Sequence, residues 1–300
     1  MLPFLAQSST VLAEGAIAER LRHHHQIELH PSLFNTPLIY EPEKAALMAS
    51  VYHEYTAVAD DFDLPILLSA PTWRLDAQRV AAAGVPTTIN RDAVRFIREV
   101  QQSAQRPEMI RCGALLGPAN DCYSPHLALS ADEAERFHTP QSEQLAAALP
   151  DFLLAQTLPA VTEAKGLGHA MRATGLPFII SFCIGRDGRI LDGTPLDTAI
   201  HHLDRALDSS PLGYMVNCSY PTFLHPGELV PSALGRIIGF DANASSKDLS
   251  ELESASRSQQ DKIENWATAM VDLNQHHGVK ILGGCCGTTP AHIRAICECL

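Results

Sequence analysis

Short apolar runs recur along this chain and alternate with segments of helical pattern, which limits the folds open to it. Eight of these runs are expected to be strands, and they cover residues 10–13, 66–69, 110–114, 152–155, 178–182, 213–216, 236–240 and 279–282. Strands that alternate with helices form parallel sheets, and eight such units close a barrel. The 300 residues, 46% of them hydrophobic, suffice for one large core. The sequence therefore predicts an α/β fold in which residues 1–300 form a single (β/α)8 TIM barrel domain.

Charge and hydropathy argue against several classes of partner. The net charge is −12 and the sequence has no run of lysines or arginines, which argues against binding to nucleic acid or to an anionic membrane surface. No apolar run approaches the roughly 18 residues that span a bilayer, and the first residues lack the charged and apolar segments of a secretory signal. A soluble, cytoplasmic protein is therefore expected, with its oligomeric state left open. The polar segment 245–261 is expected to be a surface excursion.

The segment 279–290 combines an apolar strand, two glycines, two adjacent cysteines, a third glycine and the start of a helix. Successive side chains of a strand point to opposite faces, so Cys285 and Cys286 can serve one metal only where the backbone has left the strand. The flanking glycines permit this, because glycine reaches backbone angles closed to other residues. A threonine is expected to cap the helix that begins at Pro290. Cysteines between a strand end and a helix start lie where α/β folds place their active sites.

A third cysteine completes a set of ligands suited to zinc. Cys218 also ends an apolar run and begins a loop. Three thiolates with one exchangeable fourth ligand are the arrangement of a catalytic Zn²⁺ site. A lone cysteine is more often a small buried hydrophobic residue, and this is the favoured interpretation of Cys183, although a fourth thiolate there stays open. A disulfide is disfavoured, because a cytosolic pattern of cysteines is more often metal-binding or catalytic.

Two segments of the chain, residues 283–293 and 216–218, closely resemble the homocysteine S-methyltransferase family, and the Gly-Gly-Cys-Cys-Gly match within the first is long and specific. The resemblance implies a (β/α)8 barrel in which Cys218, Cys285 and Cys286 bind Zn²⁺. It further implies that the metal binds the thiolate of homocysteine, which is methylated to methionine. The implied partners are therefore a small-molecule thiol and a methyl donor.

Residues at two other predicted strand ends are similar to substrate-binding segments of the family. Glu14 and Gly15 stand where the family usually has Asp-Gly-Gly, and the resemblance implies that the acid contacts the amino group of homocysteine. Capping of the following helix is an equally open role for Glu14. Thr72 and Trp73 resemble the Thr-aromatic element of the family's substrate loop. Trp73 can receive a cationic methyl donor by cation–π attraction, although a packing role is favoured.

Gln156 is the largest departure from the family, which usually has a glutamate there whose carboxylate holds the homocysteine amine. An amide keeps the hydrogen-bond acceptor but loses the charge, and a charge-assisted bond is roughly twice as strong as a neutral one. The change predicts weaker binding of homocysteine or a different acceptor. Asn243 lies in a segment similar to the family's Asn-Ala segment, and it is expected to occupy the fourth zinc position when substrate is absent.

No catalytic residue is expected beyond the zinc site. A free thiol has a pKa of about 8.5, and zinc coordination displaces its proton, so no strong general base is needed. No segment resembles a folate or cobalamin module, which favours S-methylmethionine or S-adenosylmethionine as the donor and leaves betaine open. Two alternatives remain. One is a zinc- and thiol-binding barrel without catalytic activity, motivated by Glu14 and Gln156, and the other is methyl transfer to a different thiol or to a selenol.

Overall fold

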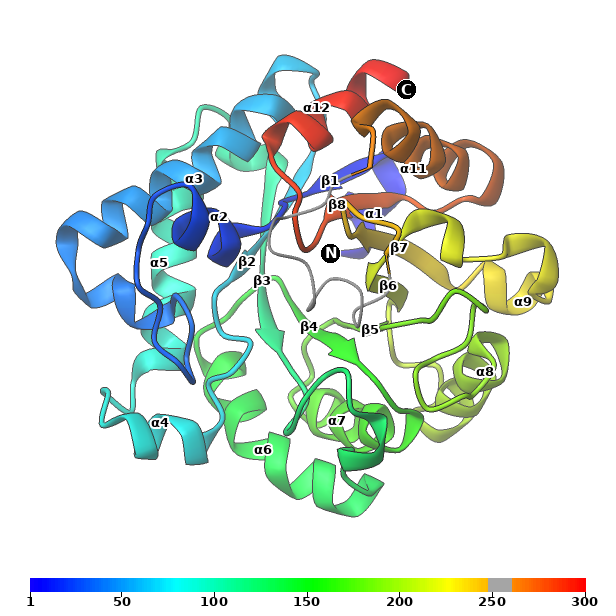
Figure 1. Cartoon of the computed structure of the whole chain (residues 1–300). Helices are drawn as coiled ribbons and strands as arrows, with labels where there is room; N and C mark the ends of the chain where they lie inside the picture. The colour runs from blue at the N-terminus through cyan, green and yellow to red at the C-terminus, as the bar shows by residue number, and fades with distance from the viewer. Residues whose placement is uncertain (248–260) are drawn as a thin grey trace.

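Eight strands close into one parallel barrel in the computed structural model of the chain, which describes residues 1–247 and 261–300 (Figure 1). In chain order they are β1 Val11–Ala13, β2 Ile66–Ala70, β3 Ile110–Leu116, β4 Phe152–Leu158, β5 Phe178–Phe182, β6 Gly213–Ser219, β7 Ile237–Ala242 and β8 Ile281–Gly284. Each strand pairs with the next one along the chain, and β8 pairs with β1. The predicted (β/α)8 barrel and its eight strands are therefore confirmed, although β2, β3, β4, β6, β7 and β8 extend past their predicted ends.

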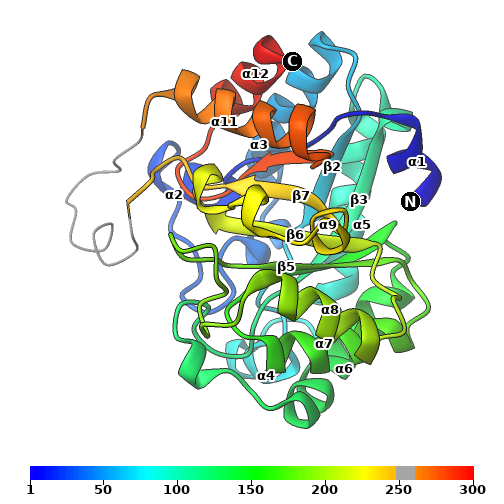
Figure 2. The ribbon, with the colours of Figure 1, turned by 90° about the vertical axis from the view of Figure 1, so that its right-hand side faces the viewer.

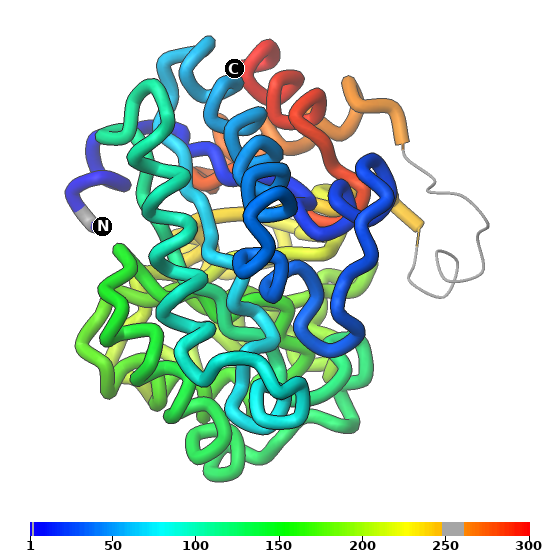
Figure 3. Tube along the Cα trace, turned by 90° about the vertical axis from the view of Figure 1, so that its left-hand side faces the viewer, coloured from blue at the N-terminus to red at the C-terminus, as the bar shows by residue number. Residues whose placement is uncertain are grey.

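Helices surround the barrel, and most of them lie between consecutive strands of the chain (Figure 1). They are α1 Leu2–Gln7, α2 Ile17–His23, α3 Pro42–Asp61, α4 Ala77–Ala83, α5 Ile89–Ser103, α6 Ala131–Ala147, α7 Val161–Ala173, α8 Leu196–Ala206, α9 Pro231–Leu234, α11 Ile263–His277 and α12 Pro290–Cys299. The helix predicted to begin at Pro290 is α12, and Thr289 is its N-cap. The last helix, α12, packs against both α11 and α3 (Figure 3). The C-terminal end of the chain therefore closes the ring of helices against an N-terminal helix.

Apolar side chains fill the inside of the barrel toward the N-terminal ends of its strands. Phe152, Met215 and Ile281 belong to one buried cluster there. Phe4 and Leu5 of α1 join the same cluster, and Figure 2 shows α1 at the opposite end of the barrel from α2, which follows β1. A larger cluster lies between the strands and the surrounding helices. Because α1 covers one end of the barrel, the other end is left for a cavity.

Two strands lose their regular geometry near their C-terminal ends. The pairing register shifts in β4 before Leu158 and in β6 before Ser219. Within these irregular stretches Thr157 has φ +64° and Cys218 has φ +51°, a left-handed conformation that is uncommon for residues with a side chain. A bulge of this kind changes the direction in which a side chain points. The irregularity of β6 therefore sets the direction of the Cys218 side chain.

Two expectations from the sequence concern the outside of the molecule. Within residues 1–247 and 261–300, no helix combines the length and the apolar character needed to cross a membrane. The predicted surface excursion over residues 245–261 lies almost entirely outside the described residues.

Candidate metal centre and substrate cavity

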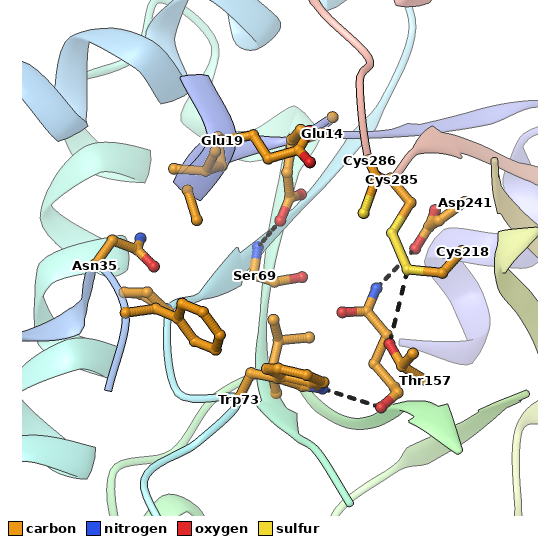
Figure 4. Close-up of a pocket in the computed structure, with 18 of the residues that line it drawn as sticks. Glu14, Glu19, Asn35, Ser69, Trp73, Thr157, Cys218, Asp241, Cys285 and Cys286 are labelled. Atoms are coloured by element: carbon orange, nitrogen blue, oxygen red, sulfur yellow. Dashed lines mark hydrogen bonds between the residues drawn. A yellow bond between two sulfur atoms is a disulfide. The ribbon is translucent and has the colours of Figure 1, made fainter. Parts of the chain in front are cut away.

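A cavity of about 460 Å³ lies at the C-terminal ends of the strands (Figure 4). Active sites of (β/α)8 barrels are found at this end, where the loops that follow the strands converge. Seven of the residues predicted from the sequence line the cavity: Glu14, Gly15, Trp73, Gln156, Cys218, Cys285 and Cys286. The two others, Thr72 and Asn243, are buried beside it.

The three cysteines converge at one side of this cavity. Their sulfur atoms lie within 4.8 Å of one another. Cys218 comes from the end of β6, while Cys285 and Cys286 form the turn after β8. Figure 4 shows the sulfur of Cys286 directed into the cavity beside the other two. Three sulfur donors that face a cavity suit a thiophilic cation with an open coordination position, so these residues fit the Zn²⁺ that the sequence implies.

Cys218 and Cys285 are joined by a disulfide, with their Cα atoms 5.4 Å apart. The expectation against a disulfide is therefore wrong for this form of the protein. Cys286 remains a free thiol, and burial, with a smaller contribution from Glu19, raises the pKa of this thiol to about 12. A metal that uses all three sulfurs therefore requires reduction of the bond, because thiolates and not disulfides are metal ligands.

A fully buried amide, Asn217, connects the strand ends around Cys218. Its Nδ2 donates to the sulfur of Cys218 at 3.3 Å and to Oγ1 of Thr157 at 2.7 Å. Its Oδ1 accepts from the backbone nitrogen of Thr157 at 2.9 Å and from the hydroxyl of Ser181 at 2.6 Å. These four contacts use both donors and both lone pairs of the amide. Asn217 therefore holds the irregular ends of β4 and β6 together.

The Cys285-Cys286 turn is held by hydrogen bonds from three directions. The backbone nitrogen of Cys285 donates to the carbonyl of Ala242 at 2.8 Å. The hydroxyl of Thr288 donates to the carbonyl of Cys285 at 2.7 Å. The backbone nitrogen of Cys286 donates to Oδ1 of Asn243 at 3.2 Å. The side chain of Asn243, expected at the fourth zinc position, thus supports the turn and does not line the cavity.

Four carboxyl groups line the cavity, those of Glu14, Glu19, Asp121 and Asp241. Glu14 and Asp241 each have one oxygen that is buried without a hydrogen-bond partner. Oε1 of Glu14 accepts from the backbone nitrogen of Ser69 at 2.9 Å, and its Oε2 is unpartnered. Oδ2 of Asp241 accepts from Nε2 of Gln156 at 3.2 Å, and its Oδ1 is unpartnered. Burial raises the pKa of Glu14 to about 7. Burial, and the charge of Glu14, raise the pKa of Asp241 well above its usual range.

The segment between β1 and α2 packs closely against the turn that carries the cysteines. A Cβ atom on Gly15 would lie 2.7 Å from Oγ1 of Thr288 and 2.7 Å from the hydroxyl oxygen of Tyr55, so this position has no room for a side chain. The N-cap of α2 is Ala16, and no side chain caps this helix. The alternative in which Glu14 caps the helix is therefore wrong, and its carboxyl is left to the cavity.

Aromatic side chains form the part of the cavity lining around Trp73. The indole nitrogen donates to the backbone carbonyl of Gln156 at 3.0 Å, and Figure 4 shows Trp73 across the cavity from the cysteines. The guanidinium carbon of Arg74 lies 4.7 Å from the Trp73 ring centre and 5.4 Å from that of Phe34. A cation of the protein itself thus contacts the indole. This contact supports the packing role for Trp73 over the role of receiving a cationic donor on the same face.

Two further residues named from the sequence have packing roles. Thr72 is fully buried, and its hydroxyl donates to the carbonyl of Leu115 at 2.7 Å and accepts from the nitrogen of Leu115 at 2.8 Å. Thr72 therefore ties the loop after β2 to β3. Cys183 is also buried, with its sulfur 3.3 Å from the carbonyl oxygen of Asn217. Among the described residues, the group of cysteines that could hold a metal does not include Cys183.

Sequence reasoning missed three polar residues of the site. Asn217 and Asp241 are polar residues near the ends of apolar strands, and a polar side chain in a buried strand needs a partner or a ligand. That rule was the signal that could have found them. Arg74 lines the cavity and forms no ion pair with any other described residue. The sequence feature that could have revealed Arg74 is its place directly after the aromatic Trp73, just past a strand end.

Comparisons with known proteins agree with this geometry. The model of the family described as homocysteine S-methyltransferase matches residues 11–300. Homocysteine S-methyltransferase YbgG of Bacillus subtilis is 24% identical over an alignment that covers 95% of this chain and 93% of that protein. S-methylmethionine–homocysteine S-methyltransferase BHMT2 of Mus musculus is 31% identical over 49% of this chain and 44% of its own length.

Solved structures share the fold. The homocysteine methyltransferase MmuM from Escherichia coli, in its metallated form, superposes with a TM-score of 0.76 at 21% identity, covering 99% of this chain and 98% of that one. The oxidized form of the same protein gives a TM-score of 0.74, with coverage of 97% and 96%.

Proposed function

The chain belongs to the homocysteine S-methyltransferase family, and on that premise we propose that it transfers a methyl group from a sulfonium donor to the thiolate of homocysteine, giving methionine. The donor in this proposal is S-methylmethionine or S-adenosylmethionine. The metal is Zn²⁺, held by Cys218, Cys285 and Cys286 in the reduced protein. The observation that carries the proposal is the convergence of these three sulfur atoms, within 4.8 Å of one another, at the side of one cavity.

The metal and the protein have separate tasks. A bound Zn²⁺ would supply Lewis acidity, which keeps a substrate thiol ionised at neutral pH. The chain's own residues bind and orient the two substrates. Glu14 offers a carboxyl group to the amino group of homocysteine, and Arg74 offers a guanidinium to the carboxylate of an amino-acid substrate. The cavity of about 460 Å³ is of the size that holds small molecules.

The apolar lining of the cavity suits the chemistry of this transfer. A new sulfur–carbon bond forms as the donor's bond to its methyl group breaks, and the electron pair of that bond stays on the donor sulfur, which leaves as a neutral thioether. A thiolate and a sulfonium thus cancel their charges in the reaction, so a poorly solvated site favours it. Phe152, Leu154, Met215 and Ile281 provide such surroundings. The mouse relative is an S-methylmethionine–homocysteine S-methyltransferase, which supports S-methylmethionine as the donor.

The test is turnover by reduced, zinc-loaded protein supplied with L-homocysteine and either sulfonium donor, with methionine detected by mass spectrometry. Methionine is expected with at least one donor. A panel of other thiols and selenols in place of homocysteine reveals a different acceptor. Tight binding of zinc and thiol without turnover on any donor would contradict the proposal and favour a barrel without catalytic activity.

Metal content provides the second arm of the test. The wild type is expected to hold about one zinc, and Cys286→Ser is expected to lose it together with activity. Cys299→Ser is the matched control, because this cysteine is exposed at the end of α12 and free. Full metal content in Cys286→Ser would remove this residue from the proposed ligand set.

A further inference from the structure

Asp241 is a buried carboxyl group in the cavity lining that the proposed reaction has not used. It lies on β7, and 5% of the residue is exposed. Gln156 donates a hydrogen bond to Oδ2 at 3.2 Å, while Oδ1 is shielded from solvent and has no partner. An acceptor atom buried in this way is costly unless a ligand supplies the missing donor.

The absence of a side chain at Gly283 makes room for this carboxyl group. Gly283 on β8 pairs with Asp241 on β7, and a Cβ atom at Gly283 would collide with Oδ1 of Asp241. The same atom would lie 2.7 Å from the Cβ of Ala13, the residue that precedes Glu14. The carboxyl of Asp241 therefore occupies the space above β8, between the end of β7 and the end of β1. Glu14 is close enough to raise the pKa of Asp241 by its charge.

Among residues 1–247 and 261–300, no cationic side chain forms an ion pair with either of these two carboxyl groups. Glu14 and Asp241 each keep one unpartnered oxygen. A cationic ligand would offset the charge of such a pair of buried acids when they are ionised. An ammonium group has a positive charge and three N–H donors, whereas the charged centre of a sulfonium donor has no hydrogen-bond donor. The unpartnered oxygens therefore favour an ammonium group over the methyl donor's sulfur.

We propose that Asp241 and Glu14 together form the subsite for the ammonium group of the amino-acid thiol, and that Gln156 is a positioning residue that holds Asp241 by its hydrogen bond. The identity of the acceptor in this assignment rests on the proposed function. The second negative charge, which an amide at position 156 on β4 cannot provide, is thus supplied by Asp241 from the end of β7.

Calorimetric titration of reduced, zinc-loaded protein tests the assignment. L-Homocysteine is compared with 4-mercaptobutyrate, which has the same thiol and carboxylate but no amine. Asp241→Asn keeps the shape of the side chain and is expected to weaken homocysteine binding about 10- to 100-fold, with 4-mercaptobutyrate changed by less than about two-fold. Asp272→Asn, at an exposed position of α11, is the matched control and is expected to change neither affinity.

Two further variants keep the test decisive. Adding Gln156→Glu to Asp241→Asn returns a carboxyl group to the subsite. The double variant is expected to recover at least about half of the loss in homocysteine affinity, measured as log Kd. Gln156→Met removes the hydrogen bond to Asp241 and is expected to weaken homocysteine alone, by about three- to ten-fold. If Asp241→Asn does not fold, Gln156→Met is used instead to compare the binding of homocysteine and 4-mercaptobutyrate.

The outcomes separate this assignment from the proposed function. An equal loss for both thiols, or a loss for neither, overturns the role of Asp241 and leaves methyl transfer to homocysteine intact. If Asp241→Asn loses affinity for the sulfonium donor alone, the carboxyl group of Asp241 binds the donor and not the thiol substrate, which also overturns the assignment. If the wild type binds neither thiol, the proposed function fails and the assignment fails with it.

Discussion

Nδ2 of Asn217 lies 3.3 Å from the sulfur of Cys218, and the amide that makes this contact is completely buried. The same amide binds the backbone and the hydroxyl of Thr157. It therefore supports both residues that adopt the left-handed conformation at the ends of β4 and β6. Loss of a group that orients a metal ligand in this way typically lowers metal affinity about 10- to 100-fold.

Asn217→Ala is expected to weaken zinc binding about 10- to 100-fold and to lower the free energy of unfolding by about 1–3 kcal/mol, because it leaves buried groups of Thr157 and Ser181 without their partner. Competition with a chromophoric chelator measures the first effect and urea denaturation the second. Asn120→Ala, at an exposed position after β3, is the control. Unchanged zinc affinity in Asn217→Ala would show that Cys218 is held by other contacts.

Gly15→Ala should destabilise the protein, because the new Cβ atom would lie 2.7 Å from atoms of both Thr288 and Tyr55. Overpacking of this kind typically costs about 1–3 kcal/mol of unfolding free energy. Gly227→Ala is the matched control, since no atom lies within 4 Å of its Cβ position, and it is expected to change stability by less than about 0.5 kcal/mol. Equal stabilities of the two variants in urea denaturation would contradict the close packing of the segment between β1 and α2 against the cysteine turn.

Binding of methionine, which carries the ammonium group but no thiol, is expected to weaken as the pH falls from about 8 to about 6. Burial raises the pKa of Glu14 to about 7, and an ammonium group pairs only with the ionised carboxylate, so protonation of Glu14 removes its partner. Glu14→Gln is expected to bind methionine weakly, with a flatter pH profile. 4-(Methylthio)butyrate, which lacks the amine, is the control ligand. A wild-type profile for methionine that is flat across pH 7 would contradict the role of Glu14.

His292 is expected to make the fold sensitive to mild acid. Burial lowers the pKa of this histidine to about 4 from an ordinary value of 6.5, and its Nδ1 accepts from the backbone nitrogen of Thr289 at 3.2 Å. Between these values the unfolded chain takes up a proton that the folded protein does not. The stability is therefore fully present above pH 6.5 and declines as the pH falls toward 4.

Urea denaturation of the wild type and of His292→Gln at two pH values measures this effect. Between about pH 7 and about pH 5 the wild type is expected to lose about 1–2 kcal/mol more than the variant does. Comparing the two proteins cancels the contribution of Glu14, whose raised pKa has the opposite sign. Parallel losses in both proteins would exclude His292 as the group responsible.

The barrel could be predicted from the sequence because its strands are buried on both faces and so appear as continuous apolar runs. The exact ends of β4 and β6 could not. They depend on the hydrogen bonds that Asn217 makes between two strands 60 residues apart, which no local pattern reveals.

The difference between local patterns and contacts of distant strands also decides which residues of the metal centre and cavity could be predicted. Cys285 and Cys286 could be singled out because their adjacency and flanking glycines are local features, and Cys218 because it ends an apolar run. Asp241 could not be assigned in advance, because the place of its carboxyl group depends on the lack of a side chain at Gly283 on the neighbouring strand. The disulfide between Cys218 and Cys285 was likewise missed, since it depends on how closely two separate strand ends approach.

The pairing of β8 with β1 has a consequence for the synthesis of the protein. A ribosome releases seven strands before the segment 281–286 emerges, so until then the chain has neither the strand that pairs with β1 and β7 nor more than one cysteine of the future cluster. Neither the ring nor the group of three sulfurs exists until that segment reaches the first strand. The chain therefore completes its group of three sulfurs in one late event, and a fragment that ends before Cys285 lacks two of them.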